Sequence, residues 1–107
     1  GSQSHPEELI QAATETGAVA IFVSSFSGHA EKWVSDLRRK CEERGLKDIL
    51  LYIGGYLLVR EEPWEETERR YKEMGFDRVY PPRTGTEVVL RDFMEDIARK
   101  KLNGGKK

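Results

Sequence analysis

Three short segments of this chain hold the residue types that could bind a ligand. They are rich in hydroxyl groups and glycine: Ser24-Ser25-Phe26-Ser27-Gly28-His29, Gly54-Gly55-Tyr56 and Pro81-Pro82-Arg83-Thr84-Gly85-Thr86. Glycine lets a ligand come close to the backbone, and hydroxyl groups both donate and accept hydrogen bonds. The sequence offers no Ser-His-Asp set, no paired carboxylates in an evidently buried setting, no Gly-x-Gly-x-x-Gly and no Gly-Lys-Ser/Thr phosphate loop. We therefore expect these segments to bind a ligand without catalysing a reaction, and we expect no metal site.

Each of these segments follows a stretch that reads as a buried strand. Residues 19–23 and 49–53 are apolar and rich in β-branched side chains, and 78–80 form a shorter strand. Helices are predicted around them, beginning at Pro6, after Gly28, at Pro63 and at Thr86, and ending before Gly17, Gly45, Gly75 and Asn103. The order α-β-α-β-α-β-α predicts one α/β domain, residues 1–107, with a parallel sheet. The run Val19 to Val23 further predicts a strand covered on both faces.

The carboxyl ends of parallel strands meet at one edge of a sheet, where open α/β proteins bind their ligands. The three segments are therefore expected to form one rim. Each also has a simpler explanation: Ser27 or Gly28 could cap the second helix, and Thr84 or Thr86 the fourth. Gly54 and Gly55 could merely turn the chain.

Composition excludes several classes of protein. The 107 residues carry 18 basic and 19 acidic side chains, so the net charge is −1 and nothing builds the positive field that nucleic acid or an anionic membrane attracts. Cys41 is the single cysteine, which rules out an internal disulfide, and a cytoplasmic location is the default expectation. No apolar run approaches the roughly 20 residues of a membrane span.

The three segments, taken with the stretches around them, resemble a known family. Val23-Ser24-Ser25-Phe26, Gly54-Gly55 and Tyr80-Pro81-Pro82-Arg83-Thr84, together with residues 7–15, 37–51 and 74–82, are similar to the cobalamin-binding domain of coenzyme-B12-dependent mutases. The similarity is greatest to the small-subunit family of glutamate (methylaspartate) mutase and runs from about Ser4 to Ile97. It implies a flavodoxin-like, doubly wound parallel sheet, here incomplete, with about three strands flanked by four helices.

The family pattern has three parts, Asp-x-His-x-x-Gly, Ser-x-Leu and Gly-Gly. Ser24 matches the second part, with Phe26 in place of leucine, and Gly54-Gly55 matches the third. Arg83 stands where the family usually has the glycine of Pro-Gly-Thr. The first part, whose histidine ligates cobalt, does not occur in these 107 residues, and neither His5 nor His29 stands at its position. By this alignment the chain begins after the family's second strand, which leaves its strands three to five.

The resemblance implies a non-catalytic, cobalamin-carrying component of an isomerase that works with a catalytic mutase subunit. The implied cofactor-binding residues are Ser24, Ser25, Phe26, Gly54, Gly55, Tyr56, Pro82 and Thr84. Without the histidine segment we expect cobalamin to bind weakly or not at all. The alternative is a flavodoxin-like interaction or scaffold domain that has lost its cofactor, and a weaker one is a nucleotide- or flavin-binding module. We also expect a homo-oligomer that pairs the exposed edge of the strand 19–23.

Overall fold

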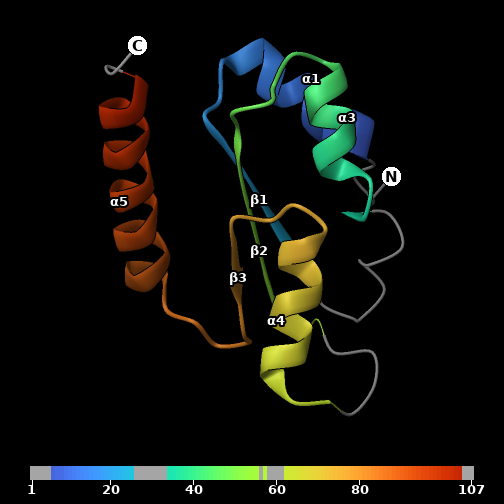
Figure 1. The fold of residues 1–107 in the computed structure, drawn as a ribbon, viewed down its shortest axis with the longest axis vertical. Helices are drawn as coiled ribbons and strands as arrows, with labels where there is room; N and C mark the ends of the chain where they lie inside the picture. Colours follow the sequence, from blue (N-terminus) through green and yellow to red (C-terminus); the bar gives the residue numbers. More distant parts are fainter. Residues whose placement is uncertain (1–5, 26–33, 56, 58–61, 105–107) are drawn as a thin grey trace.

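The computed structural model describes residues 6–25, 34–55, 57 and 62–104. Its strands are β1 (Ala20–Ser25), β2 (Leu50–Gly55) and β3 (Arg78–Tyr80), all parallel, in the order β1-β2-β3. Its helices are α1 (Pro6–Thr16), α3 (Leu37–Glu43), α4 (Trp64–Glu73) and α5 (Thr86–Gly104). Helices α1, α3 and α4 lie on one face of the sheet and α5 lies on the other (Figure 1). The predicted α/β fold is confirmed.

The strand ends differ from the prediction in one respect that matters for the site. Ser24, Ser25, Gly54 and Gly55 were expected in loops, but they are the last residues of β1 and β2, where Ser24 pairs with Gly54 and Ser25 with Gly55. The prediction ended the strands where the apolar side chains end. Backbone hydrogen bonds do not depend on side-chain polarity, so the ladder continues through serine and glycine.

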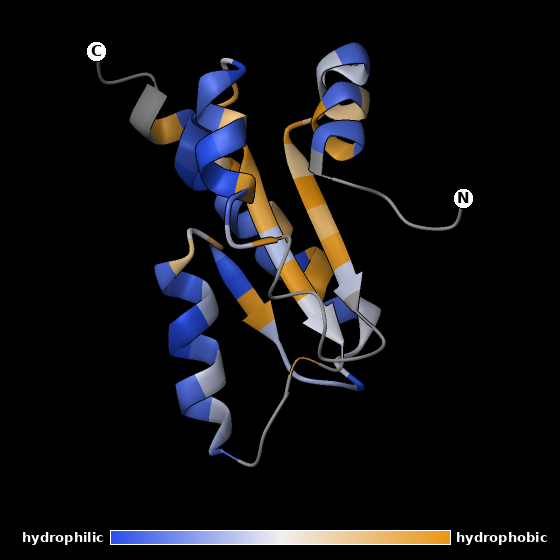
Figure 2. Ribbon diagram, turned by 90° about the vertical axis from the view of Figure 1, so that its right-hand side faces the viewer, coloured by the Kyte–Doolittle hydropathy of each residue, from blue (hydrophilic) through white to orange (hydrophobic). Residues whose placement is uncertain are grey.

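The main core lies between the sheet and helices α1, α3 and α4. The strands contribute Ile21, Val23, Leu51, Ile53 and Val79, and the helices contribute chiefly Ile10, Ala13, Leu37, Cys41 and Tyr71. The strands are apolar and the outer surfaces of the helices are hydrophilic (Figure 2). The helix ends agree with the prediction, because Gly17, Gly45 and Gly75 follow α1, α3 and α4 with positive φ angles.

The opposite face of the sheet carries a smaller core. Leu50, Tyr52 and Tyr80 are buried there, and Val89, Phe93 and Ile97 of α5 pack on them as predicted. The expectation that β1 is covered on both faces is wrong: Phe22, on the same face, is 46% exposed. In the described part of the chain, α5 therefore lies over β2 and β3 but leaves β1 open.

Buried polar groups fasten α5 to the sheet. Asp96 accepts hydrogen bonds from the Tyr52 hydroxyl at 2.5 Å and from two Arg78 nitrogens at 2.9 and 3.0 Å. Asp92 accepts one from the Tyr80 hydroxyl at 2.8 Å and forms an ion pair with Arg78 at 3.2 Å. Asp92 and Asp96 are only 8% and 4% exposed. The expectation that the chain has no buried carboxylate pair is therefore wrong. The sequence carries no local sign of the pair, because the tyrosines that bind Asp92 and Asp96 lie 12 and 44 residues away along the chain.

This network should make the fold sensitive to acid. The hydrogen bonds from Arg78 hold the pKa of Asp96 below its ordinary value. A lowered folded-state pKa contributes stability above the unfolded value of about 3.9, and that stability is lost as the pH falls through the folded value. We expect Asp96→Asn to lower the free energy of unfolding by about 3 kcal/mol at pH 7, and by much less at pH 3.

Urea unfolding at pH 7, 5 and 3 measures this difference. The matched control is Glu95→Gln, whose side chain is 57% exposed and lies 3.6 Å from Arg78. It should cost less than about 0.5 kcal/mol at every pH. An Asp96→Asn effect that does not change with pH would contradict the conclusion that Asp96 stabilises the fold as a charged carboxylate bound to Arg78.

A second polar cluster fixes the amino ends of β2 and β3. Arg38 of α3 donates to the carbonyls of Ile49 and Gly75 and to the Asp77 carboxylate at 2.8 to 3.0 Å, and Asp77 also accepts the N–H of Leu51. Gly75 has a φ of 112°, and a Cβ atom there would lie 2.6 Å from Cβ of Arg38. Only glycine fits between these groups.

Gly75→Ala should therefore destabilise the fold by about 2–4 kcal/mol, through both backbone strain and displacement of Arg38. Gly17→Ala is the control, because its φ is 67° and no atom lies within 4 Å of the added carbon. It should cost only about 1 kcal/mol. Thermal and urea unfolding measure the stability of both variants. Equal losses of stability would show that contact with Arg38 is not the reason glycine is needed at position 75.

Candidate functional site

The carboxyl ends of the three strands form one continuous rim, as the sequence predicted. Ser24 of β1 is the register partner of Gly54 in β2, and Gly54 is in turn the partner of Tyr80 in β3. The chain then leaves β3 through Pro81 and Pro82. Hydroxyl, glycine and aromatic positions thus lie side by side across the sheet.

Gly54 lies in the central strand of this rim, beneath two aromatic side chains from the flanking strands. Phe22 and Tyr80 stack across the central strand, with ring centroids 6.3 Å apart and planes inclined by 19°. A Cβ atom at Gly54 would lie 3.3 Å from both Cζ of Phe22 and Cβ of Tyr80. Glycine is needed here so that the rings can approach each other, a reason that the sequence did not reveal.

Side chains alternate between the two faces of a strand, which places the rim groups. Phe22, Ser24 and Gly54 belong to the face that carries α5, and Ser24 is exposed there. The exposed ring of Phe22 and the Ser24 side chain therefore lie on the same face of the sheet, near Gly54. Gly55 belongs to the other face and has a φ of 102°, so it does serve as a turn residue.

Part of the predicted site cannot be placed. Phe26 and Tyr56 lie outside the described residues, as do His5 and His29, and for Ser25 only the backbone is described. The predicted rim is thus represented by Ser24, Gly54, Gly55, Pro82 and Thr84.

The segment after β3 closes the rim. The Thr84 hydroxyl donates to the carbonyl of Pro81 at 2.7 Å, so Thr84 stabilises the turn. The first bonds of α5 go from Val88 and Val89 to the Gly85 carbonyl. Arg83 is exposed and has a φ of 70°, the left-handed region that favours glycine. The charged residue thus occupies a backbone conformation suited to the glycine of the resembling family.

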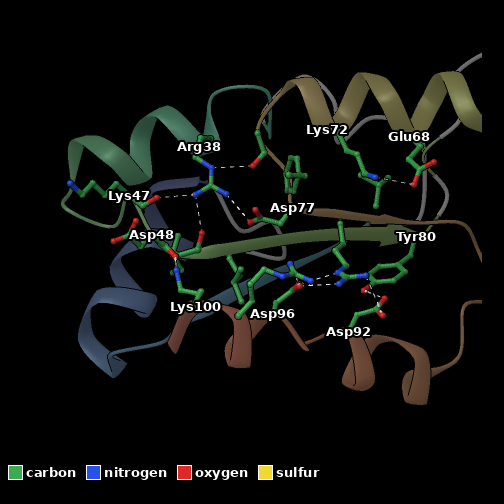
Figure 3. A pocket seen from close by; sticks show the side chains of 17 residues that line it. Arg38, Lys47, Asp48, Glu68, Lys72, Asp77, Tyr80, Asp92, Asp96 and Lys100 are labelled. Atoms are coloured by element: carbon green, nitrogen blue, oxygen red, sulfur yellow. Dashed lines mark hydrogen bonds and ion pairs between the residues drawn. The ribbon is translucent and has the colours of Figure 1, made fainter. Parts of the chain in front are cut away.

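A large cavity of about 860 Å³ lies elsewhere, along the outer side of β3 towards the amino ends of the strands (Figure 3). Its walls are mainly charged, and their charges are matched within the protein: Arg38 with Asp77, Arg78 with Asp92 and Asp96, and Lys72 with Glu68. The contacts of Arg38 and Arg78 fasten α3 and α5 to the sheet, whereas Lys72 and Glu68 pair within α4. The rim, which offers exposed hydroxyl and aromatic groups, is the better candidate for a ligand.

Phe22 and Tyr80 are the site residues that the sequence interpretation missed. Phe22 was read as part of an apolar strand and Tyr80 as the end of another. The available signal was their position on the strands that flank a glycine, because parallel neighbours bring such residues onto one face.

The geometry defines a class of protein: a parallel, flavodoxin-like α/β domain in which the carboxyl ends of the strands form an exposed rim. No protein-family model matches the chain. It is 48% identical over 97 residues to the glutamate mutase sigma subunit of Clostridium tetani, an alignment that covers 91% of this chain and 71% of that protein. The sigma subunits of Fusobacterium nucleatum and Clostridium cochlearium are 50% and 46% identical over the same length and shares.

This chain belongs to the glutamate mutase sigma subunit family. That membership agrees with the resemblance seen in the sequence and disfavours the alternative of a scaffold domain that has lost its ligand. None of the helices in the described ranges is both long enough and apolar enough to span a membrane.

The strained Arg83 gives a direct test of the rim's backbone. Arg83→Gly should raise the free energy of unfolding by about 0.5–1 kcal/mol, because glycine adopts a positive φ without the clash of Cβ. Arg83→Ala is the control, since it removes the charge but keeps Cβ, and it should change stability by less than about 0.3 kcal/mol. If alanine stabilised as much as glycine in urea unfolding, the charge rather than the backbone would be responsible.

Proposed function

We propose that this chain carries cobalamin for the catalytic subunit of a mutase, and that its rim holds the nucleotide tail of the cofactor. The observation that supports this most is the exposed ring of Phe22, which packs over Gly54 near the carboxyl end of β1, with the exposed residue Ser24 on the same face of the sheet. A flat aromatic base with hydrogen-bonding nitrogens has the shape and chemistry that such a surface accepts.

The residues that are present fit the tail of the cofactor. A base lying beside Gly54, against the exposed side of the Phe22 ring, would stack on that ring, and aromatic pairs of this kind contribute about 0.5–1.5 kcal/mol beyond the buried area. Ser24 can donate a hydrogen bond to it. Pro82 and the turn held by Thr84 border the polar remainder of the tail, with Ser25, Phe26, Gly55 and Tyr56 as the further residues that we assign to binding.

The division of labour follows from what the chain contains. Bound cobalamin supplies the radical chemistry. The residues of this chain would orient the tail, exclude water from the base and present the cofactor to a catalytic mutase subunit. Neither His5 nor His29 stands in an Asp-x-His-x-x-Gly motif, so we propose that no histidine of these 107 residues ligates cobalt. A cytoplasmic location suits the single free cysteine.

Binding measurements with two ligands test this assignment. The 107-residue chain should bind cobalamin and should bind cobinamide, which lacks the nucleotide tail, at least tenfold more weakly. Ser24→Ala should weaken cobalamin binding about fivefold to tenfold, the worth of one hydrogen bond of about 1–1.5 kcal/mol, and should leave cobinamide binding unchanged. Tryptophan-fluorescence quenching or equilibrium dialysis measures both affinities.

Thr16→Ala is the matched control, because Thr16 is an exposed hydroxyl in the last turn of α1, at the opposite end of the sheet. It should change neither affinity. Equal affinity for cobalamin and cobinamide, or a Ser24→Ala variant that binds like the original chain, would contradict a tail site at this rim.

A further inference from the structure

Arg83 is an exposed cation beyond the carboxyl end of β3 that makes no polar contact within the fold. Every other arginine in the described ranges forms an ion pair or a hydrogen bond with a neighbouring side chain. The guanidinium of Arg83 has no such partner among the described residues. Its donors are therefore available to a group from outside the chain.

The backbone of Arg83 holds this side chain at a cost in stability. Its φ of 70° lies in the left-handed region, which an arginine adopts less readily than glycine. The turn around it is fixed, because the Thr84 hydroxyl donates to the Pro81 carbonyl at 2.7 Å and the ring of Pro82 restricts the preceding residue. Strained residues of this kind cluster at ligand sites. The combination of strain and an unused guanidinium is what a ligand-binding arginine would show.

The charge of Arg83 is not neutralised by its neighbours on the rim. Among the described residues at the strand ends, 24–25, 54–55 and 80–87, Arg83 is the only cation and Glu87 the only carboxylate. Glu87 lies against Gly85, where its Oε1 is 2.7 Å from the place that a Cβ would occupy, and it forms no ion pair with Arg83. The rim therefore presents one free positive charge on its β3 side.

A phosphate is the group that this charge suits best. A guanidinium offers two parallel N–H donors that match the oxygens of a phosphate, and such bonds are stronger than those between neutral groups. The nucleotide tail of cobalamin carries one ionised group, the phosphodiester between its ribose and the rest of the cofactor. Strands β1 and β3 are two spacings apart, about 10 Å. A base beside Phe22 and a phosphate at Arg83 would thus occupy opposite sides of the rim.

We propose that Arg83 binds the phosphodiester of the nucleotide tail and so sets the direction in which the tail crosses the strand ends, from β1 to β3. The inference rests on the proposed function, since it takes the tail as the ligand of the rim. It adds a selectivity: the rim distinguishes corrinoids that carry a phosphate from those that lack it.

Three ligands separate the phosphate from the rest of the tail. They are cobalamin, cobinamide phosphate, which ends at the phosphate, and cobinamide, each with cyanide on both faces of cobalt so that only the tail differs. In about 20 mM salt, the 107-residue chain should bind cobinamide phosphate about threefold to fivefold more tightly than cobinamide, as expected for an exposed ion pair. Arg83→Ala should abolish that difference and weaken cobalamin binding by the same factor. In about 0.5 M salt the factor should fall towards one, because salt screens the pair.

A second variant separates binding from folding. Arg83→Gly should weaken cobalamin binding as Arg83→Ala does, although it relieves the strain and stabilises the fold, so that affinity and stability change in opposite directions. Lys47→Ala is the matched control: it removes an exposed cation just before β2, at the opposite end of the sheet, and should leave all three affinities unchanged.

The outcomes also distinguish this inference from the proposed function. If Arg83→Ala still preferred cobinamide phosphate, or lost cobinamide affinity equally, Arg83 would not bind the phosphate, even where Ser24→Ala weakened cobalamin binding and the tail site stood. If neither variant changed cobalamin affinity, or the original chain bound no corrinoid, the tail site itself would fail and this inference with it.

Discussion

The contact on which this structure depends most is the one between Arg78 and the two carboxylates of α5. Helix α5 has few apolar partners on the sheet, namely Leu50, Tyr52 and Tyr80. The bidentate bond to Asp96 and the ion pair to Asp92 supply the remaining attachment. Two buried charges are tolerated there because each carboxylate also accepts a hydrogen bond from a tyrosine hydroxyl. This bond replaces part of the hydration that the carboxylate loses on burial.

The same network connects the helix to the rim. The ring of Tyr80 stacks against the ring of Phe22, and the Tyr80 hydroxyl donates a hydrogen bond to Asp92. Burial, followed by the hydrogen bond to Asp92, raises the pKa of Tyr80 above its ordinary value, so the hydroxyl stays protonated and donates to Asp92 at neutral pH. A ligand that moved the Phe22 ring would therefore act on the group that anchors the amino-terminal half of α5.

Much of the fold could be predicted from the sequence, for a specific physical reason. Residues 49–53 are uniformly apolar and Gly17, Gly45 and Gly75 end helices, and both signals are local. Buried Asp92 and Asp96 could not be predicted, because a carboxylate on a charged helix reads as solvent-facing until its partners on β2 and β3 are known. The role of Gly54 was hidden likewise: the sequence shows a glycine pair, but the rings that require Gly54 come from the two flanking strands.

The two faces of the sheet differ in how much of their surface the helices cover. On the face of α1, α3 and α4, the strands are covered by Ile10, Leu37 and Tyr71, and close packing leaves no room for a ligand. On the other face, α5 lies over β2 and β3 and is attached largely through the bonds from Arg78 to Asp92 and Asp96. There β1 carries the exposed ring of Phe22 next to Gly54. Phe22 of β1 is accessible because, among the described elements, α5 packs mainly on Leu50 and Tyr52 of β2 and Tyr80 of β3.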